Sequence, residues 1–142
     1  MAYHLSIFVE NKPGKIEKIT KVLADNGINL RAITLASTGE YGVLKLLVNN
    51  PDLAYDRLKQ NSIAVSKRKI IIAVIDDQPG GMFNLLSAMS KNNINLEDCY
   101  GFVLEDKKQA AIIMEVEKYP EAETVLAAAG IKLLPENELE SF

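Results

Sequence analysis

The chain of 142 residues has no tryptophan, one cysteine and one histidine. The single cysteine, Cys99, excludes an internal disulfide and fits a reducing compartment. The longest strongly apolar stretch, Ile70 to Ile75, is far shorter than the roughly 20 residues that a membrane-spanning helix needs. The N-terminus enters an alternating strand pattern without a signal peptide. We therefore expect a cytoplasmic protein that does not bind a membrane.

The chain also lacks a net positive charge. The net charge is −3, and no basic run exceeds Lys67-Arg68-Lys69. Such a chain does not attract phosphate backbones, and a sheet that binds RNA would need more aromatic residues than Tyr3 and Phe8. The hydrophobic share of 48% is nevertheless normal for a globular core. We expect a folded protein that binds no nucleic acid.

Groups that could catalyse a reaction are few. His4 lies in a predicted strand, where packing is its expected role, and no histidine or basic cluster stands beside Cys99 in the sequence. The carboxylate pairs Asp76-Asp77 and Glu105-Asp106 are adjacent residues, which on a strand point to opposite faces. Metal-binding and phosphate-binding sequence motifs are absent from the chain. We therefore predict a non-catalytic protein without a cofactor.

What the sequence does contain is a repeat. Hydrophobic periodicity and turn residues predict, in order, a strand at 3–9, a helix at 16–23, strands at 30–37 and 41–48, a helix from 51 to 58 and a strand at 63–67. The same order returns with a strand at 70–75, a helix at 82–89, a hairpin, a short helix closed by Gly130 and a strand at 131–134. The predicted fold class is α+β, with two tandem βαββαβ modules.

Residue identities support this duplication. Pro13-Gly14 aligns with Pro79-Gly80 at an offset of 66 residues (79 − 13), and the same offset places Ile28-Asn29-Leu30 on Ile94-Asn95-Leu96. Six positions between 11 and 30 are identical in the two copies, where roughly one would be expected from average composition. We infer that the repeat is real.

The predicted module boundaries are 1–68 and 69–142. Only Lys67 to Lys69 separates the two predicted units, which is too short for a flexible tether. Later in the modules Leu58 aligns with Leu126 at an offset of 68, which implies two additional residues in the loops of the second copy. The acidic end, Pro135 to Phe142, is predicted to be a solvated tail.

Each copy places Pro-Gly where a strand passes into a helix. The first N–H groups of a helix lack internal partners and carry partial positive charge, so a carboxylate fits there. Asn29 and Asn95 each lie fifteen residues after the glycine, and we expect them at the same end of the sheet as the turn. A carboxamide can donate to a carboxylate and accept from an ammonium, the two groups of every free amino acid. Asn11 and Asp77 could complete the ammonium site.

These residues resemble the ACT domain family. The resemblance rests on Asn11-Lys12-Pro13-Gly14 followed by Gly27-Ile28-Asn29-Leu30, and it covers the chain as two modules. It implies ferredoxin-like modules whose antiparallel sheets pair side by side, and an amino acid held between the Pro-Gly turn of one module and the strand of a neighbour. It also implies regulation of a metabolic enzyme in trans and a homodimer formed through exposed strand edges.

The resemblance is incomplete at one ligand-contacting position. In the serine-binding module of phosphoglycerate dehydrogenase the turn resembles His-x-Asn-x-Pro-Gly, and its histidine and two asparagines contact the effector. Asn11 and Asn29 match the asparagines, whereas Val9 replaces the histidine. In the second copy the corresponding residues are Ile75, Asp77 and Asn95. The resemblance therefore does not imply serine as the ligand.

The expected site residues follow from the turn and the strand start in each copy. They are Asn11, Lys12, Pro13, Gly14, Lys15, Ile16, Asn29 and Leu30 in the first, and Asp77, Gln78, Pro79, Gly80, Gly81, Met82, Asn95 and Leu96 in the second. Ile16, Leu30, Met82, Leu96 and the strand around 32–36 are candidates for setting specificity. Two alternatives stay open: a module of the same fold that regulates a partner by contact alone, and a small ferredoxin-like enzyme that uses His4 or Cys99.

Overall fold

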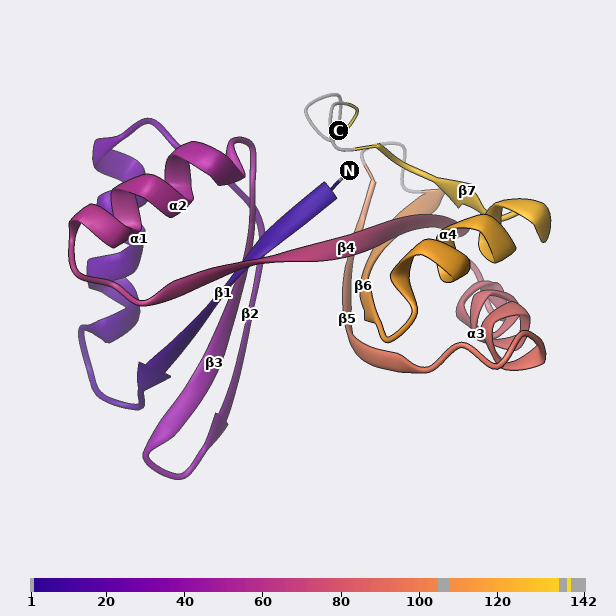
Figure 1. The fold of residues 1–142 in the computed structure, drawn as a ribbon, viewed down its shortest axis with the longest axis horizontal. Coiled ribbons are helices and arrows are strands. Elements are labelled where there is room, and N and C mark those ends of the chain that lie inside the picture. Colours follow the sequence, from indigo (N-terminus) through magenta and orange to yellow (C-terminus); the bar gives the residue numbers. More distant parts are fainter. Residues whose placement is uncertain (1, 105–107, 136–137, 139–142) are drawn as a thin grey trace. The chain divides into compact units, whose positions relative to one another are not determined.

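The computed structural model describes residues 2–104, 108–135 and 138. Within them the elements are β1 (Ala2–Glu10), α1 (Lys15–Asp25), β2 (Leu30–Thr38), β3 (Tyr41–Val48), α2 (Pro51–Gln60), β4 (Val65–Asp76), α3 (Gly81–Lys91), β5 (Leu96–Val103), β6 (Gln109–Val116), α4 (Tyr119–Ala128) and β7 (Lys132–Leu133) (Figure 1). The α+β class and the repeated βαββαβ order are as predicted. No helix among the described residues is long and apolar enough to cross a membrane.

The chain divides into two compact units, one of residues 3–68 and one of residues 69–142 together with 1–2. The strands predicted at 63–67 and 70–75 are a single strand, β4, which continues through the boundary. The expectation of two separate strands is therefore wrong, although the boundary between the units falls within Lys67 to Lys69. These residues contain no glycine, proline or asparagine that would favour a turn, so the extended backbone continues through them.

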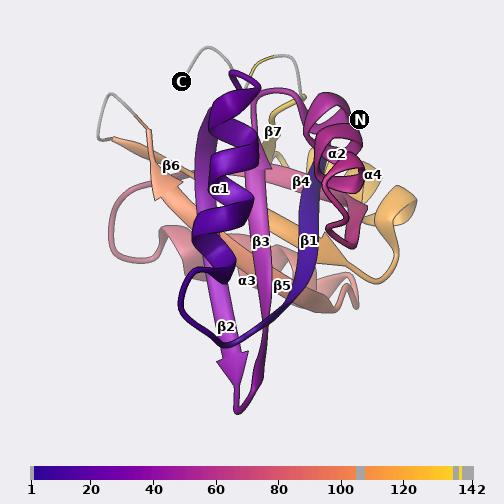
Figure 2. The ribbon, with the colours of Figure 1, turned by 90° about the vertical axis from the view of Figure 1, so that its left-hand side faces the viewer.

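In the first module β3 lies between β1 and β2, and β4 lies on the other side of β1. The antiparallel register places Leu46 opposite both Leu5 and Ile33. Helices α1 and α2 cover one face of this sheet (Figure 2). Between the helices and the sheet lies the core, formed by Leu5, Ile7, Val9, Ile19, Val22, Leu23, Ile28, Leu44, Leu46, Val48, Ala54 and Leu58.

In the second module β4 is central, because it pairs with β7 on one edge and with β6 on the other, and β5 follows β6. The unbroken apolar pattern of β4 agrees with this position, since Ile70 to Val74 are all buried. The core is formed by Ile71, Ala73, Leu85, Met89, Met114, Ala122 and Leu126. β6 aligns with β3 at an offset of 68, so the two additional residues fall between β5 and β6.

Helices α1 to α4 all end in the same way. After α1 the N–H of Ile28 donates to the carbonyl of Leu23 (2.9 Å) and that of Gly27 donates to Ala24 (3.1 Å), the paired bonds of a Schellman motif. The other three helices repeat both bonds, and the residue in the left-handed conformation has φ of +66° at Gly27, +61° at Ser62, +55° at Asn93 and +83° at Gly130. The backbone therefore repeats even where the residue type differs.

Candidate functional site

The two Pro-Gly turns are built from the same backbone hydrogen bonds. The N–H of Asn11 donates to the carbonyl of Glu40 (2.7 Å), and the N–H of Asp77 donates to Lys108 (2.8 Å). Two further bonds close each turn at equivalent positions, and a third starts each helix. Each turn is thereby tied to the hairpin between the second and third strands of its module. The duplication thus preserves the geometry of the turn although most side chains around it differ.

Glycine is required at both turns because of the backbone conformation. Gly14 has φ of +86° and Gly80 has φ of +90°, and each immediately precedes its helix. No side chain caps the first turn of α1 or α3. Backbone N–H groups at a helix start are suited to an anionic ligand such as a carboxylate. The turn can therefore contribute hydrogen bonds to a carboxylate without any basic side chain.

The charges around the two turns differ. In the first module the carboxylate of Glu10 pairs with Lys12 (3.0 Å) and Lys15 (3.7 Å). The hydrogen bond and charge of Lys12, supported by Lys15, hold the pKa of Glu10 below its usual range. Residues 10–18 carry three lysines and two glutamates, whereas residues 76–84 carry two aspartates and no basic residue. The first turn therefore has the surroundings that favour an anion.

Asn11 has a structural role in addition to its expected one. Its side-chain amide donates to the carbonyl of Gly39 (3.1 Å), so it links the Pro-Gly turn to the hairpin turn. The equivalent residue, Asp77, is a carboxylate and cannot donate such a bond. This difference distinguishes the two copies at a position that we expected to contact the ammonium group of a ligand.

Asn29 and Asn95 do not lie at the same end of the sheet as the turns, and that expectation is wrong. The N–H of Asn49, after β3, donates to the carbonyl of Asn29 (3.2 Å), and the N–H of Glu117, after β6, donates to Asn95 (3.4 Å). The Pro-Gly turns are bonded to the opposite ends of these strands. With eight residue steps along β2, the separation is roughly 26 Å at 3.3 Å per residue. One module cannot place its own turn and asparagine on one amino acid.

The apolar residues expected at the site face inward. Ile16 and Leu30 are half-buried and pack against the first core, and Met82 and Leu96 do the same in the second module. The remaining predicted turn residues are exposed, apart from Gly81, which is buried at the start of α3. In each module the predicted turn residues therefore lie together at the start of the following helix. Asn29 and Asn95 lie apart from the turn of their own module.

A pocket lies beside each Pro-Gly turn. The first has a volume of about 230 Å³ and is lined by Ile7, Phe8, Val9, Glu10, Lys15, Lys18, Ile19, Tyr41, Ser62, Ile63 and Ala64. The second has a volume of about 300 Å³ and is lined by Val74, Ile75, Asp76, Gly81, Asn84, Leu85, Gln109, Gly130, Ile131 and Lys132. Every residue of the second pocket is the repeat equivalent of one in the first, at an offset of 66 before the hairpin and 68 after it.

Sequence reasoning missed these pockets. It identified the strand end and the helix start that form two of the walls. The third wall is the segment between the module's second helix and its last strand, at 62–64 and at 130–132. The Schellman motifs that end α2 and α4 position this segment. Of the two residues that end these helices in the left-handed conformation, only Gly130 was a signal in the sequence, because serine does not favour that conformation.

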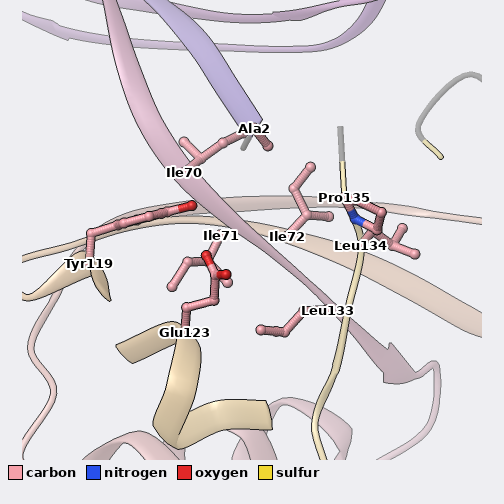
Figure 3. A pocket seen from close by; sticks show the side chains of 9 residues that line it. All are labelled: Ala2, Ile70, Ile71, Ile72, Tyr119, Glu123, Leu133, Leu134 and Pro135. Carbon is pink, nitrogen blue, oxygen red and sulfur yellow. The ribbon is translucent and has the colours of Figure 1, made fainter. Parts of the chain in front are cut away.

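Two other cavities lie in the second module. One, of about 380 Å³, is lined by Asn95 together with Glu117 and Lys118. The other, of about 210 Å³, lies between Ala2, the start of the buried part of β4, and Leu133–Pro135 (Figure 3). Its lining is mainly aliphatic, with Tyr119 and Glu123 as the polar contributors. Neither cavity repeats the turn pockets.

The groups considered for catalysis lie apart from these pockets, with one exception. His4 is fully buried in β1, and Cys99 is exposed in β5. Desolvation, together with the charge of Asp98, raises the pKa of the Cys99 thiol, so the thiol stays protonated at neutral pH. The exception is Asp76, which lines the second pocket. Glu105 and Asp106 lie outside the described residues, within which no cluster of His, Cys, Asp or Glu could hold a metal ion.

A family model described as an ACT domain pair matches residues 1–142. The chain belongs to the ACT domain pair family. The tandem ferredoxin-like modules are thus those of an ACT domain pair.

Solved structures share this fold. Protein BT0572 from Bacteroides thetaiotaomicron is 30% identical to the ACT domain pair, with a TM-score of 0.93 over 99% of this chain and 96% of that chain. The ligand-free regulatory subunit of aspartate kinase from Thermus thermophilus is 18% identical, with a TM-score of 0.66 over 90% of each chain. A structure of aspartokinase alpha and beta subunits is 15% identical, with a TM-score of 0.62 over 89% of this chain and 90% of that chain. Comparison with curated proteins finds no match.

Proposed function

We propose that this ACT domain pair is a non-catalytic regulatory protein that binds a free amino acid and acts on a metabolic enzyme. The observation that carries the proposal is the Pro-Gly turn, which occurs twice with equivalent backbone bonds, a glycine in the left-handed conformation and no side-chain cap. Such a turn suits the carboxylate that every amino acid carries. The similarity to a regulatory subunit of aspartate kinase supports a regulatory role.

The position of the asparagines restricts how the ligand is held. Since Asn29 lies roughly 26 Å from the Pro-Gly turn of its own module, an amino acid that contacts both groups must take them from different modules. We propose this arrangement for Asn29 and Asn95, with the second module belonging to the same chain or to a second copy. We also propose a cytoplasmic homodimer, whose formation light scattering would test.

The first experiment is thermal unfolding of the full chain with each of the twenty amino acids at millimolar concentration. A ligand at 100 times its Kd stabilises the folded state by about 2.7 kcal/mol. A selective increase in Tm for one or a few related amino acids supports the proposal. Unchanged Tm values with all twenty would contradict it and favour the module that regulates by contact alone.

The predicted asparagine contacts can then be tested separately. Asn29→Ala or Asn95→Ala should weaken binding of the identified amino acid by about 1 to 3 kcal/mol, because each removes one polar contact to a charged group. The backbone bonds of both residues remain, so the fold should be retained, as circular dichroism would show. Wild-type affinity in both variants would remove Asn29 and Asn95 from the site.

A further inference from the structure

The sheet of the first module has one face that α1 and α2 leave uncovered (Figure 2). We propose that this face binds the same face of a second copy of the chain, with the two Phe8 side chains against each other. This inference names a contact surface for the proposed homodimer and rests on that part of the proposed function, but it does not depend on the amino acid. Three observations support it: the apolar side chains on this face, the lack of charge around them and the different residues in the second module.

Three exposed side chains form an aromatic patch on this face, namely Phe8, Tyr41 and Val43. Phe8 is opposite Val43 in the register of β1 and β3, and Tyr41 lies two residues before Val43 on β3. Ile7 and Val9, on either side of Phe8, point into the core, so Phe8 points away from the helices. The rings of Phe8 and Tyr41 stack with their centroids 5.0 Å apart. The exposed fractions are 67% for Phe8, 46% for Tyr41 and 37% for Val43, so the patch is open to a partner.

The surroundings of the aromatic patch carry little free charge. On β2 the neighbours on this face are Ala36 and Thr38, which are both exposed. The nearest charged residues on the face, Lys45 and Glu10, already have partners within the described residues. In a contact between two identical faces, free charges near the symmetry axis would repel their own copies. An uncharged patch therefore suits a second copy, whereas a charged partner would gain no ion pair from it.

The second module carries different residues at the equivalent positions. These are Val74, Gln109 and Ala111, and both Val74 and Ala111 are buried. Within its described residues each chain therefore presents one aromatic sheet face rather than two. A contact between two identical faces closes on itself, which gives a pair of chains and not a growing filament.

The size of the aromatic patch suits the centre of an interface. At roughly 200 Å² for a whole aromatic side chain, the exposed fractions leave about 230 Å² of the two rings in water. A stable interface buries about 800 Å² on each partner, and aromatic residues at its centre contribute much of the binding energy. The patch would thus be the apolar centre of the contact, with the polar residues around it as the rim.

Pairing of sheets at their edges would not cover this patch. The outer strands in the described sheet are β2 and β5, and a strand added beside either of them continues the sheet in its own plane. The Phe8 and Tyr41 side chains, which stand on β1 and β3, would remain in water. The face contact is therefore distinct from the strand-edge contact that the family resemblance implies.

The test is sedimentation velocity of the full chain over a range of protein concentrations. Phe8→Asp and Phe8→Lys each place like charges against each other and should weaken association at least about tenfold. An equimolar mixture of the two variants should restore association, because opposite charges then meet. Phe83→Asp is the matched control, since Phe83 is similarly exposed (71%) but lies on α3 in the second module. The control should associate like the wild type.

A further variant avoids the introduction of a charge into a strand. Phe8→Thr removes the ring but keeps a residue that favours strands, so it should fold even if the charged variants do not. It should also weaken association by about tenfold or more. Circular dichroism of each variant checks that the fold is retained.

The outcomes separate this inference from the proposed function. If the wild type associates and the folded Phe8 variants associate equally well, the face contact is overturned and the homodimer stands. A mixture that associates no better than either charged variant would also overturn it, as would an equal loss of association in Phe83→Asp. If the wild-type chain is a monomer at every concentration, the face contact and the proposed homodimer both fail. Amino-acid binding is tested independently of either, by the Tm measurements.

Discussion

The repeat allows a reciprocal test of backbone strain at Ser62 and Gly130. These equivalent residues follow α2 and α4 and adopt the left-handed conformation, with φ of +61° and +83°. Both make the same Schellman bonds. We predict that Ser62→Gly stabilises the protein and that Gly130→Ser destabilises it, by similar amounts.

The magnitude follows from two opposing terms. A non-glycine residue in the left-handed region costs about 1 to 2 kcal/mol, and glycine loses about 0.5 to 1 kcal/mol more on folding through its greater chain freedom. The expected net change is therefore about 0.5 to 1 kcal/mol in each direction. Steric clashes do not complicate the comparison, because Ser62 is exposed and a Cβ added at Gly130 meets no atom within 4 Å.

Urea unfolding without ligand measures both variants. The midpoint should rise for Ser62→Gly and fall for Gly130→Ser, with the slope m unchanged. The double variant should resemble the wild type, since the two sites lie in different modules and share no contact partner in the described hydrogen bonds. A lower midpoint for Ser62→Gly would refute the assignment of strain to this position.

Three further perturbations test other parts of the structure. Gly81→Ala should destabilise the protein by about 1 to 3 kcal/mol in urea unfolding, because the added Cβ would lie 2.2 Å from the carbonyl oxygen of Asp76; an unchanged midpoint would contradict the tight turn. The ionised Glu10 side chain should stabilise the wild type above the usual carboxyl pKa, and this contribution should be lost as the pH falls through the lowered pKa of Glu10. Glu10→Gln should lack this pH-dependent contribution. Free energies of unfolding measured between about pH 2 and 6 would show the difference, and parallel curves for the variant and the wild type would exclude it. Asn50→Ala should cost about 1 kcal/mol, because the Asn50 side chain caps α2, and a midpoint equal to that of the wild type would show that this cap is not needed.

The order of the elements could be predicted because its signals are local. The alternation in β1, the helical spacing of Ile16, Ile19 and Leu23, and the stop at Asn26-Gly27 depend only on neighbouring residues. The Pro-Gly turns were found for the same reason. The continuity of β4 was missed because three charged residues resemble a linker in composition, although they favour no turn.

The placement of the site residues depended on topology rather than on local pattern. An 11-residue helix such as α1 carries the chain back by about 16 Å at 1.5 Å per residue, which moves Asn29 to the far end of the sheet. The pockets depend on the approach of a strand end to a loop more than fifty residues later, as for Val9 and Ile63, which line the same pocket. No periodicity in the sequence encodes such a contact.

The continuity of β4 also bears on how the protein can be divided for study. The strand supplies four residues, Val65 to Arg68, to the first module and its remaining residues to the centre of the second. Between Val65 and Asp76, all of which the structure describes, no loop exists at which a protease or a truncation could separate the modules without cutting a strand. If the chain is cut after Arg68, the fragment that contains the second module starts inside β4, its central strand. Deletion experiments therefore need two overlapping fragments, each of which retains the whole of β4.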